Sequence, residues 1–165
     1  MPAIVSIGEA LVEVMRTGRD QPLDRPAPFS GPYPSGAPAI FASAAARLGA
    51  SVGFVGTVGN DPFGACVLGR LLADGVDCSA VRTVKTHLTG IAFVAYQSDG
   101  GRRFVFHLAR SAAALVKSEQ IPANYWDNVR YLHIMGSSLT LSASMRRACY
   151  QAAERVHAQG GTVSL

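Results

Sequence analysis

Residues 35–64 constrain the fold more than any other part of the chain. They read as a turn, a helix, a strand, a second turn and the start of a second helix. Pro38 suits a first helical turn, where the amide has no intrahelical partner, and Gly49 suits the left-handed conformation that ends a helix. Asp61 and Pro62 begin the next helix, because the carboxylate can accept hydrogen bonds from exposed amides and proline fixes the first turn.

The glycines of this stretch indicate close approach to the backbone. Residues 52–58 form a short, mostly apolar run that Gly53 and Gly56 interrupt, as expected for a buried strand near other main chain. Gly59 and Gly64 leave the following loop without side chains, so a ligand could reach the main chain there.

The ordered motifs resemble the N-terminal signature of the ribokinase-like (PfkB-type) carbohydrate kinases. The run SGAPAIFASAAARLGA, followed by VGTVGNDPFG, is similar to the family's Gly-Gly-Ala-Pro-Ala-Asn, Ala-x-x-Leu-Gly and Gly-x-Asp-x-x-Gly. The resemblance implies an α/β fold, a ribokinase-like three-layer α/β/α sandwich that is partial here and carries a small β-hairpin lid. Gly8-Glu9-Ala10-Leu11 and the GAPA turn are nearest to the fructokinase and 2-keto-3-deoxygluconate kinase branches.

The resemblance also implies one side of a sugar site. In the family, an acid five residues after the first glycine binds sugar hydroxyls, and that position is Glu13 in the strand predicted at about 10–15. A carboxylate can accept two hydroxyl hydrogen bonds, although Glu13 alone could equally be a solvent-facing residue of an alternating strand. The turn Ser35-Gly36-Ala37 would hold the sugar by its backbone. Two residues depart from the family pattern: Ser35 replaces a glycine, and Ile40 stands where many members have a sugar-binding Asn.

A β-hairpin is predicted at 89–108, because the turn formers 98–101 separate two β-rich segments. Both of its faces are apolar, so the domain should cover one face and a ligand or second subunit the other. The resemblance implies a lid over the sugar and a homodimer contact, and an ordinary hairpin of the main sheet is the alternative. The residues expected to exclude water are Ala92, Val94, Phe104 and Phe106. Arg110, which follows the lid, could clamp a carboxylate or phosphate on the sugar or be a surface charge.

The remaining segments complete the α/β pattern. Residues 16–34 are polar and rich in proline, which predicts a surface loop without regular structure. Residues 131–135 read as a strand that ends at 136–138, Ser142 as the cap of a helix to 159, and 162–165 as the start of another strand. His133 could act as an acid or base, but a hydrogen-bonded structural histidine is the favoured interpretation.

Composition excludes several classes of partner. Hydrophobic residues make up 48% of the chain and charged residues 16%, as in globular proteins. The net charge of +4 is not clustered, so a nucleic-acid partner is not expected. Three cysteines without a Cys-x-x-Cys spacing favour a reducing, cytoplasmic location and neither zinc nor disulfides. No signal peptide or membrane-spanning segment is indicated.

The motif set predicts that residues 1–165 are the N-terminal, sugar-binding part of a longer kinase. Relatives continue with a nucleotide-binding half that holds Gly-Ala-Gly-Asp, whose amides stabilise the transferring phosphate and whose Asp deprotonates the sugar hydroxyl; this chain has no such motif and no catalytic residue. ATP and Mg²⁺ are therefore implied for the full-length family only. A non-catalytic sugar-binding or dimerisation module is the alternative, and an unrelated α/β domain is a third, weaker one.

Overall fold

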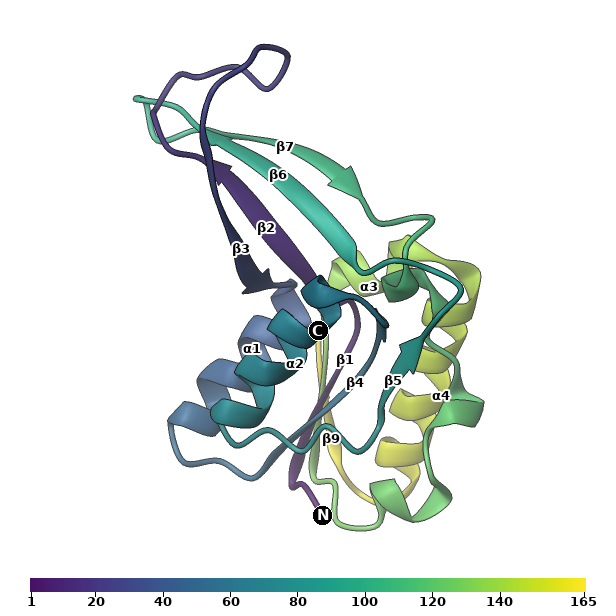
Figure 1. Ribbon diagram of the computed structural model, residues 1–165. Coiled ribbons are helices and arrows are strands. Elements are labelled where there is room, and N and C mark those ends of the chain that lie inside the picture. The colour runs from purple at the N-terminus through teal and green to yellow at the C-terminus, as the bar shows by residue number, and fades with distance from the viewer.

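The computed structural model describes residues 1–165, which form two sheets (Figure 1). The main sheet has five parallel strands in the order β5-β4-β1-β8-β9, and the second has four in the order β3-β2-β6-β7. The main strands are β1 (Ile4–Ile7), β4 (Val52–Gly59), β5 (Val81–Val84), β8 (Tyr131–Ile134) and β9 (Thr162–Ser164). The second sheet, here called the lid sheet, comprises β2 (Leu11–Arg16), β3 (Phe29–Ser35), β6 (Gly90–Tyr96) and β7 (Arg102–His107).

Helices cover both faces of the main sheet (Figure 1). On one face lie α1 (Ala37–Arg47) and α2 (Pro62–Ala73), which share a buried apolar cluster with Phe54. On the other lie α4 (Ala143–Ala158) and the 3₁₀ turns η1 (Ala112–Leu115), η2 (Ser118–Gln120) and η3 (Ala123–Trp126), around Val5 and Leu132. Successive strand residues point to opposite faces, so the buried strand β4 contributes Val55 to one cluster and Phe54 to the other. The predicted three-layer α/β/α arrangement is confirmed.

The helix boundaries follow local capping. The Asp61 carboxylate accepts hydrogen bonds from the backbone amides of Gly64, at 2.8 Å, and Thr89, at 2.7 Å. Burial alone would raise the pKa of Asp61, but these hydrogen bonds outweigh it and the pKa lies below its usual value. The Ser142 hydroxyl accepts from the Met145 amide at 3.1 Å and begins α4 as predicted.

The lid sheet stands at the carboxyl ends of the main strands (Figure 1). Strand β2 follows β1 almost directly and pairs with β6 in parallel, while β3 and β7 pair antiparallel on the outside. Thr89, just before β6, accepts a hydrogen bond from the Gly59 amide at the end of β4. In α/β proteins this end of a parallel sheet is where ligands bind.

One sequence prediction about secondary structure was wrong, and one short helix was not predicted. Residues 29–35, expected to be irregular, form β3; Pro32 and Pro34 are tolerated because β3 is an edge strand, where missing amides break few ladder bonds. The lid therefore has four strands in place of the expected hairpin and single strand. The strand predicted to end at 136–138 is β8, which ends just before them, and the residues that follow form a short helix that was not predicted, α3 (Gly136–Leu141).

Arg16 holds the connection between β2 and β3. Its guanidinium donates to the carbonyl oxygens of Pro22, Arg25 and Ala27 and lies 3.9 Å above the Phe29 ring centroid. The loop is thus tied to the lid sheet by one buried cation. No helix in the structure has both the length and the apolar character that crossing a membrane requires.

Candidate functional site

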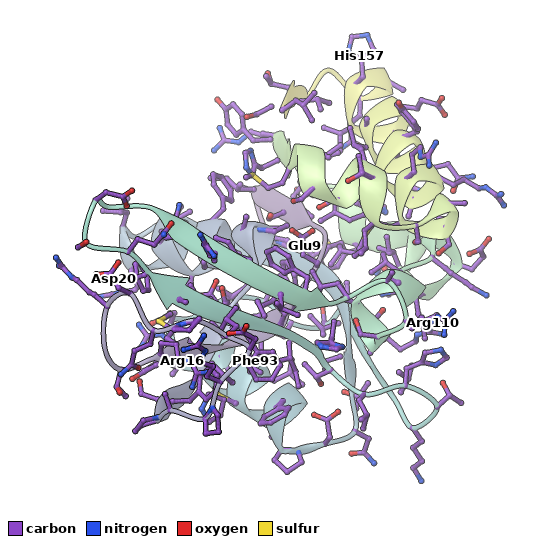
Figure 2. All side chains as sticks on the ribbon, turned by 90° about the horizontal axis from the view of Figure 1, so that it is seen from above. Glu9, Arg16, Asp20, Phe93, Arg110 and His157 are labelled. Atoms are coloured by element: carbon purple, nitrogen blue, oxygen red, sulfur yellow. The ribbon has the colours of Figure 1, made fainter.

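A cleft of about 660 Å³ lies between the lid sheet, the first turn of α1 and α3. We call it the lid cleft. Figure 2, seen from above, places Glu9 between the lid strands and the α3 region. The predicted site residues that line the lid cleft are Glu13, Ser35, Gly36, Ala37, Ile40, Phe104 and Phe106.

Strand register explains why the predicted lid residues share a face. Glu13 is opposite Ala92, which is opposite Phe106, and residues paired across strands point to the same side of a sheet. Phe104 and Phe106 reach the cleft, with 36% and 55% of their surface exposed and their rings stacked at 5.2 Å. Ala92 and Val94 are fully buried beneath this layer, so they support the cleft wall without lining it.

Glu13 and Ser35 form a polar pair at the cleft. The Ser35 hydroxyl donates to Glu13 Oε1 at 2.9 Å, and Ser35 is buried. The bond fixes the carboxylate and leaves Glu13 Oε2 without a protein donor. A carboxylate held in this way can accept hydrogen bonds from ligand hydroxyls.

Gly36 brings two chain segments together at the bottom of the cleft. Its φ of +104° is one that L-residues rarely adopt, and a Cβ would lie 2.4 Å from the Glu9 carbonyl oxygen. Only glycine lets the start of α1 approach the segment between β1 and β2 so closely. The start of α1, which no side chain caps, therefore lies beside the Glu13–Ser35 pair.

Glu9 is a cleft residue that the sequence analysis did not select. It is 5% exposed, and its carboxylate accepts hydrogen bonds from the hydroxyls of Ser137, at 2.6 Å, and Ser138, at 2.8 Å. The serines belong to α3, nearly 130 residues further along the chain. The only signal in the sequence was the Gly8-Glu9-Ala10-Leu11 motif, which gave no partner for the carboxylate.

The arginine in the cleft is Arg102, and the sequence analysis proposed Arg110. Arg102 lies on the same face of β7 as Phe104 and Phe106, with its guanidinium carbon 5.5 Å from the Phe104 ring centroid. Arg110 is exposed and does not line the cleft, and Figure 2 places it at the periphery. The alternation of residues 102, 104 and 106 could have identified Arg102.

His133 lies away from the lid cleft. Its ring stacks on Phe41 with centroids 3.9 Å apart, and Nδ1 is 3.1 Å from the Ser164 hydroxyl oxygen. Burial lowers the pKa of His133, so the neutral form is favoured. This packing agrees with the structural role favoured from the sequence.

Chemically, the lid cleft suits a neutral polyol better than a nucleotide. Its polar side chains are two carboxylates, several hydroxyls and one guanidinium, and the aromatic rings of Phe104 and Phe106 lie beside them. Two carboxylates repel a triphosphate, and the chain has no group of three or more acidic, histidine or cysteine side chains that could hold a metal ion. The residues of this chain therefore do not fit ATP with Mg²⁺.

The comparisons with known proteins identify the family. A model of the family described as pfkB family carbohydrate kinase matches residues 1–165. The chain belongs to this family. The ribokinase-like resemblance of its motifs is thereby confirmed.

Relatives are similar along almost the whole of this chain. A fructokinase of Escherichia coli is 35% identical over 133 residues, covering 81% of this chain and 42% of its own length. Probable fructokinase-3 of Arabidopsis thaliana is 32% identical over 160 residues, with 97% and 46% covered. The chain thus spans about half the length of the curated relatives that it matches.

Solved structures agree with the fold. A fructokinase from Xylella fastidiosa superposes with a TM-score of 0.86 at 29% identity, over 99% of this chain and 50% of the other. A structure from E. coli, described as a ribokinase II in complex with ATP and Mg²⁺, is 41% identical with a TM-score of 0.93, over 99% and 52%.

Proposed function

We propose that the whole protein transfers the γ-phosphate of ATP to a hydroxyl of a sugar, and that this chain supplies the sugar-binding half and the lid. The observation that carries the proposal is the Glu13–Ser35 pair, which lines the lid cleft in a chain of the pfkB family of carbohydrate kinases. ATP and Mg²⁺ would bind outside residues 1–165, because the residues of this chain do not fit them.

Each part of the lid cleft has a role in this proposal. Glu13 accepts hydrogen bonds from sugar hydroxyls, and the backbone at Gly36 and Ala37 positions the ring. Phe104 and Phe106 close over the sugar and exclude water, which limits hydrolysis of ATP in place of transfer. Arg102 lines the cleft and can donate hydrogen bonds to an oxygen of the bound sugar.

The test compares Glu13→Ala with Glu154→Ala in the protein made from its complete coding sequence. Glu154 is exposed on α4, so its replacement controls for the loss of one charge. Hydrogen bonds to a charged group contribute about 1.5–3 kcal/mol each, so Glu13→Ala should weaken sugar binding roughly tenfold to a hundredfold. Affinity for ATP should stay unchanged, and Glu154→Ala should behave as wild type.

Two outcomes separate the proposal from its alternatives. Sugar-dependent ADP formation supports the kinase, whereas calorimetric sugar binding without any ADP formation supports a non-catalytic binding module. Equal sugar affinity in Glu13→Ala and wild type removes Glu13 from the site.

We also propose that the protein is a homodimer joined through its lid sheets. All six residues of β7 are exposed, and as the edge strand it leaves one row of backbone groups unpaired. Val105, 45% exposed on the face away from the cleft, would be buried by a second copy. Val105→Lys should give a monomer in sedimentation velocity, and Leu72→Lys, an exposed position on α2, should leave the dimer intact.

A further inference from the structure

One wall of the lid cleft is apolar, and except for the buried Leu11 its side chains are at least partly exposed. We call it the apolar wall; it consists of Leu11, Ile40, Phe104, Phe106, Leu108 and Leu141. A single exposed apolar side chain is ordinary, and Ile40 is 52% exposed. Here, however, apolar side chains from β2, α1, β7 and α3 gather around one cleft, which indicates a surface that a ligand covers.

The cleft also holds polar groups, among them Arg102 beside Phe104, but Ile40 adds none. Glu13 is paired with Ser35, and Glu9 is held by Ser137 and Ser138. The Ile40 side chain has no polar atom, and its amide donates to the Gly36 carbonyl oxygen at 2.8 Å. The first turn of α1 therefore offers the cleft an apolar side chain and no free donor at this position.

The two kinds of sugar substituent would fare differently against Ile40. A sugar hydroxyl that packs against Ile40 loses its hydrogen bonds to water and gains none from the protein, so its burial costs free energy. A methylene or methyl group in the same place gains from burial. We propose that Ile40 makes the lid cleft selective for a deoxy sugar, one that presents CH₂ or CH₃ in place of a hydroxyl to the first turn of α1. This selectivity rests on the proposed function, because it requires that the sugar lies in the lid cleft.

The test measures binding of matched sugar pairs by calorimetry to the protein made from its complete coding sequence. The pairs are ribose with 2-deoxyribose, fructose with 1-deoxyfructose, and 2-ketogluconate with 2-keto-3-deoxygluconate. In wild type, the deoxy member of at least one pair should bind about tenfold tighter or more. Ile40→Asn, which supplies a donor and an acceptor, should abolish or reverse that ratio, and Ile40→Val should retain it.

The outcomes distinguish the inference from the proposed function. If the parent sugar of every pair binds as tightly as its deoxy form, or if Ile40→Asn leaves the ratio unchanged, the selectivity is overturned while the sugar site stands. If none of the six sugars binds to wild type, the proposed function falls and the selectivity falls with it. Ile40 is half exposed, so both variants should keep the wild-type unfolding midpoint, and the wild-type ratio tests the proposal without either.

Discussion

Replacing Gly36 by alanine should destabilise the protein far more than the same replacement at Gly49. Both glycines have positive φ, +104° and +89°. At Gly49 nothing lies within 4 Å of the added Cβ, whereas at Gly36 the Cβ would lie 2.4 Å from the Glu9 carbonyl oxygen and 3.1 Å from the Ala10 Cα. Comparing Gly36→Ala with Gly49→Ala therefore separates the cost of backbone strain from the cost of a steric clash.

The expected sizes follow from these contacts. Gly49→Ala costs about 1–2 kcal/mol for the left-handed backbone, less the 0.4–1 kcal/mol or so that alanine saves in the unfolded chain. Gly36→Ala adds overpacking of about 1–3 kcal/mol against backbone atoms, which cannot rotate away as a side chain can. We expect a loss of about 1 kcal/mol at Gly49 and about 2–4 kcal/mol at Gly36.

Urea denaturation followed by circular dichroism measures both values in the protein made from its complete coding sequence. The unfolding slope should stay constant while the midpoint moves, since the surface exposed on unfolding does not change. If the two variants lose equal stability within about 0.5 kcal/mol, the close approach of α1 to the Glu9 segment is refuted.

Three further predictions concern polar and thiol groups. Asp61→Ala should lower the free energy of unfolding by about 1 kcal/mol, because the variant loses the cap of α2. The pKa of Asp61 in the folded protein lies below the usual 3.8, so this stabilisation is present above pH 3.8 and is lost as the pH falls below it. Acid unfolding of wild type and variant, compared side by side, measures the difference. Ser138→Ala should cost about 1–3 kcal/mol in urea denaturation, because it removes one of the two hydroxyl donors of the buried Glu9 carboxylate; a loss as small as that of Ser98→Ala, an exposed control, would contradict this. Burial, with a contribution from Glu9, raises the pKa of Cys149 to about 12, so iodoacetamide at pH 8 should leave it unmodified in the folded protein, and mass spectrometry showing rapid labelling would argue against its burial.

Local features of the fold were predictable because their causes lie within a few residues. The caps of α2 and α4 are examples: the oxygens of Asp61 and Ser142 each accept from an amide three residues later. The buried strand β4 was likewise evident from its apolar run. Strand β3 was missed because proline content indicates a loop, and only its place at the edge of the lid sheet makes Pro32 and Pro34 acceptable.

The site was predictable only where a motif carried it. Glu13, Gly36 and Ile40 came from the family resemblance, and the structure brings them together in the lid cleft. Arg102 and Glu9 were missed: the alternation of residues 102, 104 and 106 was not followed to Arg102, and nothing local links Glu9 to α3. Their positions depend on the pairing of β6 with β7 and on the packing of α3 against the segment after β1.

The sequence by itself determined where α1, α2 and α4 begin and end, that β4 is buried, and which family the motifs resemble. These properties depend on φ preferences and on hydrogen bonds between residues a few positions apart, so a short segment is enough to set them. The tertiary structure decided which charges and apolar side chains share the lid cleft. That outcome depends on strand register and on contacts between segments more than 100 residues apart, such as Glu9 with Ser137 at a separation of 128, and no local pattern encodes it.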